Sequence, residues 1–200
     1  MNAQVKEINT RINILDKAAP LFAAKGYNGV SMRDLSKAVG LSAAALYHHF
    51  PDKHALYFEV MKHSFVDKAN AIASSVSSTG EPIERLEGFI KHFSSMIIGD
   101  QNFRALVMWE LLDGDEARLK LVAEEVLLEP FKAVKALIAE IAPGEDHYML
   151  TISSIWLVLS HSASAPMCQF LPGWNPSYST ASVISAHVIA LLRNNINLTE

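Results

Sequence analysis

The side chains best suited to chemistry lie between residues 31 and 53, above all in the segment from Ser42 to His49, which reads SAAALYHH. This segment offers a hydroxyl, a phenol and two imidazoles beside three alanines. Phenol and imidazole groups can donate hydrogen bonds to phosphate, alanine can contact a thymine methyl, and serine can donate or accept at a base edge. The segment therefore has the residue types of a surface that docks on DNA.

Two short helices have to position these groups. Ser31 is the expected N-cap of a helix from Met32 to Val39, and Asp34 stands where it would complete a capping box. Gly40 ends that helix where a left-handed backbone costs least, and Ser42 caps a second short helix. A tight, glycine-containing connection of this kind is typical of a helix-turn-helix. Its small shared core would consist of Leu35, Val39, Leu41, Leu46 and Phe50.

On the second helix, small residues at the N-terminus would let the backbone lie deep in a major groove, with Tyr47 and His48 donating to phosphates. Lys53, in the first turn of the next helix, would add a charged phosphate contact. From Ser42 to Phe50 there is no Arg, Lys, Asn or Gln, so this helix cannot read guanine or adenine through a bidentate pair. Recognition of the base sequence would then depend on Arg33, His48, contacts with thymine methyls and the shape of the DNA. Any two short helices with a glycine turn can also pack this way, which leaves a purely structural role open.

Charge is unevenly divided along the 200 residues, whose net charge is −4. Residues 1–60 hold seven basic and five acidic side chains, whereas residues 61–200 hold ten basic and sixteen acidic ones. The N-terminal part is therefore the more favourable for contact with phosphate, although global positive charge cannot be the basis of any nucleic-acid binding. Half of the chain is hydrophobic and 19% is charged, which excludes a disordered chain.

Apolar residues recur at helical spacing through nearly the whole chain, and no stretch shows strand alternation, so the predicted fold class is all-α. Pro20 and Pro130 are expected to kink the helices that contain them. A linker over residues 74–82, SSVSSTGEP, would separate four helices from five, a total of nine. The five expected beyond the linker span 83–98, 101–113, 115–141, 146–165 and 178–195.

Residues 8–60 closely resemble the DNA-binding domain of TetR-type (tetracycline-repressor-like) transcriptional regulators. The segments that carry the resemblance are Phe22 to Tyr27, Ser31 to Leu35, Gly40 to Ser42, Leu46 to Phe50 and Lys53 to Leu56. It implies a DNA-binding domain in residues 1–52, a connecting helix in 53–75, and an effector-binding and dimerisation domain in 76–200. The DNA-binding residues that it implies are Met32, Arg33, Ser42, Ala43, Ala44, Tyr47, His48, His49 and Lys53.

By the same resemblance, the second domain binds a small effector inside a helical bundle, and the protein is a repressor rather than an activator. Effector binding would shift the connecting helix and change the spacing of the two recognition helices of a dimer. Those helices must match major grooves ~34–36 Å apart. Large apolar residues with a few polar ones could line the pocket, although such stripes equally suit an ordinary core. The pocket candidates are Phe89, Phe93, Met96, Met108, Trp109, Leu112, Trp156, Ser160 and His161.

The last two expected helices are rich in Ser and Ala at spacings of three and four, beside larger apolar residues. Small residues let helix axes approach, and the apolar neighbours supply burial. Two such helices from each subunit would form a four-helix interface about a two-fold axis, which the resemblance also implies; the alternative is packing inside one subunit. The predicted interface residues are Ile152, Ile155, Leu159, Ala163, Val183, Ala186 and Leu191.

No arrangement of catalytic residues stands out, and there is no serine elbow or glycine-rich phosphate loop. Cys168 is the single cysteine, fits a reducing cytosol and has no identifiable base nearby. The segment from Met149 to Met167 falls short of a spanning helix, and the N-terminus has no secretory signal. We therefore expect a cytoplasmic, non-enzymatic protein without cofactor, metal or membrane partner. The alternative is a helical-bundle ligand carrier or enzyme that does not bind DNA. The titratable residues without metal-ligand spacing are His92, Glu110, Asp113 and His147.

Overall fold

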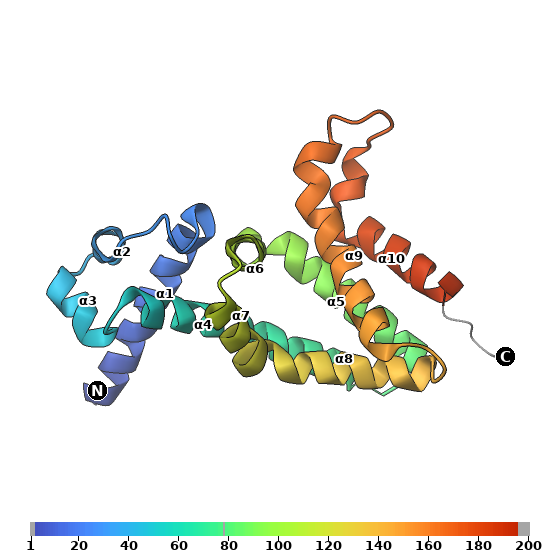
Figure 1. Ribbon diagram of the computed structural model, residues 1–200, viewed down its shortest axis with the longest axis horizontal. Coiled ribbons are helices and arrows are strands. Elements are labelled where there is room, and N and C mark those ends of the chain that lie inside the picture. The colour runs from blue at the N-terminus through green and yellow to red at the C-terminus, as the bar shows by residue number, and fades with distance from the viewer. Residues whose placement is uncertain (1–2, 78, 196–200) are drawn as a thin grey trace. The chain divides into compact units, whose positions relative to one another are not determined.

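The structure is a computed structural model that describes residues 3–77 and 79–195. Every regular element in these ranges is helical, which confirms the all-α fold class (Figure 1). The α-helices are α1 (Ala3–Lys25), α2 (Met32–Val39), α3 (Ala43–His49), α4 (Lys53–Val76), α5 (Pro82–Gly99), α6 (Gln101–Asp113), α7 (Glu116–Val122), α8 (Leu128–Ile141), α9 (His147–Cys168) and α10 (Ala181–Asn195). A π-helical turn, η1 (Ala123–Leu127), joins α7 to α8, and a 3-10 turn, η2 (Pro176–Ser179), precedes α10. Within the described ranges, no helix has the length and hydropathy needed to cross a membrane.

The run from α7 through η1 to α8 is the helix predicted at 115–141. Counted as one helix, it gives the predicted total of nine over the described residues. In a regular helix the ring of Pro130 would clash with the carbonyl of Val126, four residues earlier. Val126 lies inside η1, so the helix is irregular where the proline disfavours regular geometry. Helix α1, in contrast, stays α-helical through Pro20.

The helices form two compact units. The first contains residues up to Asp67 together with Asn102–Val126, and the second contains Lys68–Gln101 together with the chain from Leu127 onward. By packing, α6 and α7 group with the N-terminal helices. The rings of Phe65 and Phe103, for example, lie 4.5 Å apart. The functional boundaries expected at residues 52 and 75 remain a prediction.

The first unit is built on aromatic and aliphatic side chains from α1 to α4. The ring of Phe22 meets that of Tyr57 edge-on at 4.8 Å, and Tyr57 in turn meets Tyr27 at 5.1 Å. Edge-to-face pairs of this kind add to the stabilisation from burying apolar area. The fully buried side chains around them include Ile14, Leu35, Leu46, Phe50, Leu56, Val60 and Met61.

In the second unit, α5 packs against α8, α9 and α10 (Figure 1). Arg85 ties this bundle together, since its Nε donates to the carbonyl oxygen of Val76 at 2.8 Å and its Nη1 donates to the Glu140 carboxylate at 2.9 Å. The buried side chains of the four helices include Leu86, Phe89, Ile90, Ile97, Val134, Leu137, Ile138, Val158, Ile184 and Val188.

Helix α9 buries three small hydroxyl residues in this core, beside Val158 and Leu159. Thr151 and Ser154 are fully buried, and Ser162 nearly so. The Thr151 hydroxyl donates to the carbonyl of His147 at 2.6 Å, and that of Ser154 donates to the carbonyl of Leu150 at 2.7 Å, so both are satisfied within the helix. Exposed residues follow one another every three or four positions on another face, which we call the α9 stripe. They are Met149, Ser153, Trp156, Ser160, Ala163 and Met167.

Candidate nucleic-acid interface

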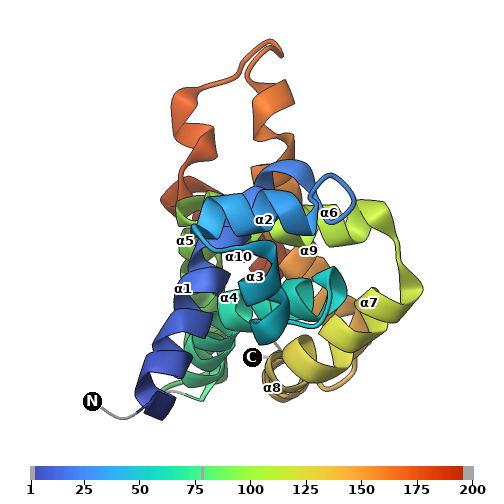
Figure 2. The same ribbon diagram turned by 90° about the vertical axis from the view of Figure 1, so that its left-hand side faces the viewer.

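The caps predicted for α2 and α3 are present in the structure, and Figure 2 shows both helices facing the viewer. Ser31 Oγ accepts the backbone N–H of Asp34 at 3.1 Å, and the Asp34 carboxylate accepts that of Ser31 at 3.1 Å. The hydroxyl and backbone N–H of Ser31 thereby hold the pKa of Asp34 below its usual range. Gly40 ends α2 in the left-handed region, at φ 74°, and Ser42 Oγ accepts the N–H of Ala45 at 3.1 Å. Hydrogen bonds from nearby residues therefore fix where both helices begin.

Helix α3 is also held at its C-terminal end, by a residue outside the motif. Arg11 of α1 donates from Nη1 to the carbonyl oxygen of His49 at 2.6 Å, and its guanidinium lies 4.3 Å above the ring of Phe50. A cation at this end complements the helix dipole. Arg11 is not predictable from the sequence, because a partner 38 residues away leaves no spacing signal. The predicted core is buried except for half-buried Leu41.

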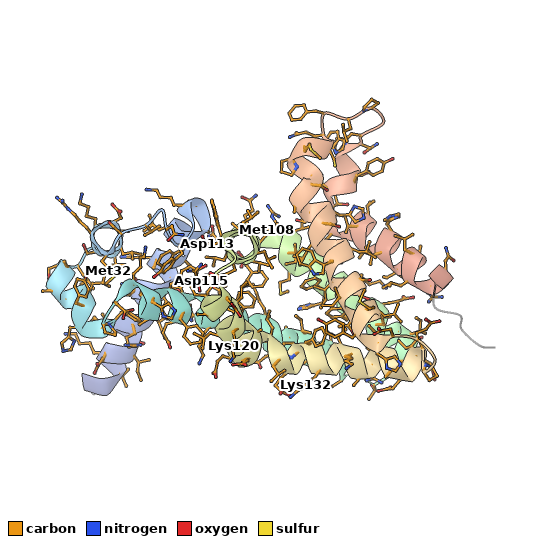
Figure 3. All side chains as sticks on the ribbon, in the orientation of Figure 1. Met32, Met108, Asp113, Asp115, Lys120 and Lys132 are labelled. Atoms are coloured by element: carbon orange, nitrogen blue, oxygen red, sulfur yellow. The ribbon has the colours of Figure 1, made fainter. Side chains whose placement is uncertain are left out.

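The predicted docking face of α3 is exposed. Ala43 and Ala44 carry only methyl groups, so the backbone of the first turn is accessible to a groove. Tyr47 is 49% exposed, which leaves its hydroxyl free to meet a phosphate. Ser42 and His48 are exposed beside them. On α2, Arg33 is exposed, whereas Met32, labelled in Figure 3, is half-buried.

Two other predicted DNA-contact residues are engaged inside the first unit. His49 is half-buried, and its Nδ1 is buried without a hydrogen-bond partner. The ammonium of Lys53 donates to the carbonyl oxygen of Tyr27 at 3.0 Å and to that of Val30 at 3.1 Å. An ammonium has three donors, so Lys53 keeps one for a phosphate. The DNA contacts of both residues remain predictions.

The predicted pocket residues divide between the two units. Phe89 and Phe93 are buried on α5 of the second unit, with their rings stacked at 5.6 Å, and half-buried Met96 follows on the same helix. Beside Phe93, Ser94 is fully buried and its hydroxyl has no hydrogen-bond partner. Ser94 is not predictable as a site residue from the sequence, because a lone serine among apolar residues forms no pattern.

Helix α6 carries the three pocket candidates that belong to the first unit. Trp109 donates from Nε1 to the carbonyl oxygen of Ala23 at 3.0 Å. Its ring lies so close to Gly26 that a Cβ there would approach it to 2.9 Å, and Gly26 also has a left-handed φ of 67°. Met108, labelled in Figure 3, is half-buried, and Leu112 is 74% exposed. Trp109 thus packs on the end of α1, and its predicted role in a pocket remains a prediction.

On α9, Trp156 and Ser160 were also predicted for the pocket, and both lie on the exposed α9 stripe. His161 is half-buried, with its ring edge-on to that of His187 at 5.3 Å. Burial lowers the pKa of His161, and the neighbouring His187 lowers it further. In the part of the chain that the structure describes, no three His, Cys, Asp or Glu side chains are grouped to hold a metal ion.

The predicted dimer residues also lie on different faces of α9 and α10. Ala163 is on the α9 stripe, and Ala186 is exposed on α10, whereas Leu159 is buried inside the unit. The position of each residue around the helix explains the difference, since the buried face of α9 consists of three small hydroxyl residues together with Val158 and Leu159. The remaining predicted residues, all half-buried, are Ile152, Ile155, Val183 and Leu191.

The N-terminal helices match a known protein family. Residues 14–60 fit the family model of the bacterial regulatory proteins, tetR family. Over 80 residues the chain is 34% identical to the biofilm operon icaADBC HTH-type negative transcriptional regulator IcaR of Staphylococcus aureus (strain Newman). The match covers 40% of this chain and 43% of that relative, so it spans less than half the length of either protein.

Two solved structures share the fold over nearly the whole chain. The first, AibR in complex with isovaleryl coenzyme A and operator DNA, has a TM-score of 0.72 at 21% identity, over 91% of this chain and 97% of that one. The second, the transcriptional regulator FadR from Bacillus subtilis in complex with stearoyl-CoA, has a TM-score of 0.73 at 16% identity, over 94% and 99%. At such low identity these likenesses show the fold alone. Together with the match at residues 14–60, they confirm the resemblance seen in the sequence: the N-terminal helices fit the model of the bacterial regulatory proteins, tetR family, and the fold of the whole chain is like that of known regulators.

Proposed function

We propose that this protein is a DNA-binding transcriptional repressor that acts as a homodimer and leaves its operator when a small-molecule effector binds. The observation that carries the proposal is the exposed face of α3, where small residues lie at the start of a capped helix with Tyr47 and His48 beside them. Helices with this arrangement enter a major groove, and phosphate contacts then fix their register. The negative regulation by IcaR supports a repressor.

Two copies of α3 in a dimer would read two half-sites ~34–36 Å apart. Because α3 lacks side chains for bidentate base contacts, the sequence preference would come from Arg33, His48, thymine methyls and the shape of the DNA. The dimer contact that we propose is the α9 stripe with the exposed face of α10 around Ala186. Both surfaces combine small residues with apolar ones, which suits close packing of helices about a two-fold axis.

For the effector we propose an acyl-CoA that binds in the second unit. Two proteins with the same fold, AibR and FadR from Bacillus subtilis, have been solved in complex with isovaleryl coenzyme A and stearoyl-CoA. In this chain, the stacked rings of Phe89 and Phe93 offer an apolar surface for an acyl chain, and the unpartnered Ser94 hydroxyl offers one buried polar contact. To release DNA, the effector must bind the free and the DNA-bound conformations with different affinity.

The proposal assigns the chain no catalytic role and no cofactor, and it places the protein in the cytoplasm, where it would meet chromosomal DNA. The competing function is a helical-bundle ligand carrier or enzyme whose N-terminal helices only pack. The two differ in one measurable property. A regulator binds operator DNA with an affinity that falls steeply with salt, because phosphate contacts release counterions, whereas a carrier has no such affinity.

The test is fluorescence polarisation with DNA from upstream of the protein's own gene. We expect binding that yields to specific competitor and weakens by at least about a hundredfold between roughly 50 and 200 mM salt. Adding stearoyl-CoA or isovaleryl-CoA should release the DNA, while free coenzyme A serves as the control. Absence of salt-sensitive binding would exclude a regulator. Binding that neither acyl-CoA affects would exclude these effectors but not DNA binding.

A further inference from the structure

A buried guanidinium organises the contact between α7 and the N-terminal helices. Arg118 is 5% exposed and pairs with three carboxylates. Its Nε donates to Glu110 at 3.2 Å, its Nη2 donates to Asp113, and its Nη1 pairs with Asp115 at 3.2 Å. Asp113 and Asp115 flank the turn between α6 and α7, as their labels in Figure 3 show. All five donors of a guanidinium lie in one plane, so this set of acceptors fixes its orientation.

The oriented guanidinium meets the loop between α1 and α2. Its central carbon lies 4.4 Å over the ring of Tyr27, a distance typical of a cation–π contact. The residues on either side of Tyr27 also contact α6. Gly26 lies against the ring of Trp109, and the Asn28 side-chain amide donates to the Asp113 carboxylate at 2.8 Å. Three consecutive loop residues are therefore positioned by α6 and α7.

The same loop holds Lys53. Its ammonium donates two of its three hydrogens to the carbonyl oxygens of Tyr27 and Val30, and the nitrogen lies 4.1 Å from the centroid of the Tyr27 ring. The Tyr27 ring therefore contacts both the Lys53 ammonium and the Arg118 guanidinium. Lysine has a long flexible side chain, and here its head group is placed by a loop rather than by its own helix.

Two buried polar groups, Glu110 and Tyr57, belong to this cluster. Glu110 Oε2 and the Tyr57 hydroxyl are both buried and have no hydrogen bond of ordinary geometry. Burial raises the pKa of the Tyr57 hydroxyl, and the carboxylate of Glu110 raises it further, so both effects disfavour ionisation of the phenol. The Tyr57 hydroxyl and the Glu110 carboxylate thus interact inside the same cluster as Arg118.

We infer that Arg118 and Tyr27 are positioning residues for the phosphate contact of Lys53, acting through the α1–α2 loop. The inference rests on the proposed function, because it concerns DNA binding. With Arg118 and the Tyr27 ring in place, the two carbonyls fix the ammonium so that its third donor meets the DNA backbone. Without either, the loop loses a support and the ammonium loses its fixed position. Neither residue has to touch DNA for this effect.

The experiment is a double-mutant cycle on affinity for operator DNA, with Lys53→Ala as one change and Tyr27→Leu or Arg118→Lys as the other. Lys53→Ala should weaken binding by about tenfold or more and lower the salt slope by about one. Tyr27→Leu and Arg118→Lys should each weaken operator binding by roughly three- to tenfold and lower the salt slope. Neither effect should exceed that of Lys53→Ala. In the Lys53→Ala background, neither should weaken binding further.

The control is Arg85→Gln in the second unit, which removes an arginine and its ion pair with Glu140 without touching this loop. It should leave the salt slope unchanged. Arg118→Lys leaves the buried Glu110 carboxylate poorly paired, so affinities are compared per folded molecule, from circular dichroism at the assay temperature. Tyr27 is only half-buried, and Tyr27→Leu leaves every Arg118 ion pair intact, so this variant decides the matter if Arg118→Lys unfolds.

Two results would overturn the inference. If Tyr27→Leu weakens binding equally with and without Lys53, it acts on the stability of the helices and not through the ammonium. If it leaves affinity and salt slope unchanged, the loop does not position Lys53. Both results require a wild-type protein that binds operator DNA. A wild type without salt-sensitive binding would instead refute the proposed function.

Discussion

The α2–α3 region and helix α9 are the two surfaces that meet other molecules in the proposed function, and they are held in different ways. Helices α2 and α3 are fixed mainly by short-range hydrogen bonds, from the Ser31 box to the Ser42 cap. The orientation of α9 depends on packing against α5, α8 and α10, through a buried face of small residues such as Ser154 and Ser162. A capped short helix thus has its exposed face set locally, whereas a long helix in a bundle is oriented by fit.

The largest effect is expected at the locally fixed surface. Ala44→Glu would place a carboxylate on the exposed first turn of α3, against the phosphates of a groove. Like charges at that distance should weaken operator binding by more than about a hundredfold, with the thermal unfolding midpoint nearly unchanged. Fluorescence polarisation measures the binding. The matched control is Ala117→Glu, an exposed alanine in the first turn of α7, which should bind like wild type. Tight binding by Ala44→Glu would show that α3 does not enter the groove.

A second prediction concerns the α9 stripe. Trp156 lies at the centre of the stripe and is 40% exposed. Trp156→Arg should therefore leave the fold of one subunit intact but place a cation in the proposed dimer contact. An obligate contact buries more than ~2,000 Å², and an unpaired charge inside it should shift the protein toward monomers. Sedimentation at micromolar concentration measures the change.

The control for the dimer prediction is Leu112→Arg, which changes a 74% exposed apolar residue outside the stripe and should sediment like wild type. A monomeric wild type would refute the dimer, and with it the spacing of two recognition helices. A dimeric Trp156→Arg would move the contact elsewhere, and the half-buried residues Ile152 and Ile155 would be the next candidates.

These two surfaces also mark how much the sequence could predict. The caps at Ser31 and Ser42 and the left-handed Gly40 follow from the preferences of single residues, so their positions and the exposed face of α3 were predictable. For α9 the sequence predicted a helix but not its buried face, because Trp156 and Val158 are both apolar and only packing separates them. Polarity cannot identify a buried face made of serines that bond their own backbone.

Long-range contacts were beyond the sequence for a related reason. Arg11 and Arg118 meet partners on other helices, and Trp109 packs on the end of α1, so no spacing rule brings them together. For the same reason, α6 and α7 were assigned to the second domain, whereas their packing groups them with the N-terminal helices. The helix boundaries themselves were close, and α6 spans the predicted residues 101–113.

A third prediction uses two neighbouring serines to test the orientation of α9. Ser154 is fully buried and Ser153 is exposed on the stripe. Ser154→Leu would force a large side chain between closely packed helices and should lower the free energy of unfolding by about 1–3 kcal/mol. Ser153→Leu, the matched control, should change it by less than about 0.5 kcal/mol. Chemical denaturation followed by circular dichroism measures both, and equal effects would show that the assigned face of α9 is wrong.

The smallest expected effect is a pH dependence at His161. Burial and the nearby ring of His187 lower the pKa of His161 in the folded protein, so the unfolded chain binds this proton more tightly. Its contribution to stability is therefore complete above the ordinary histidine pKa of about 6.5 and is lost as the pH falls through that value toward the folded pKa. Between pH 7.5 and pH 5.5, the wild type should lose more stability than His161→Gln, in which this titration is absent. His187→Gln should reduce the difference without removing it, because burial remains the larger cause. Urea unfolding at several pH values measures the comparison, and equal pH dependence in wild type and His161→Gln would contradict the assigned environment of this ring.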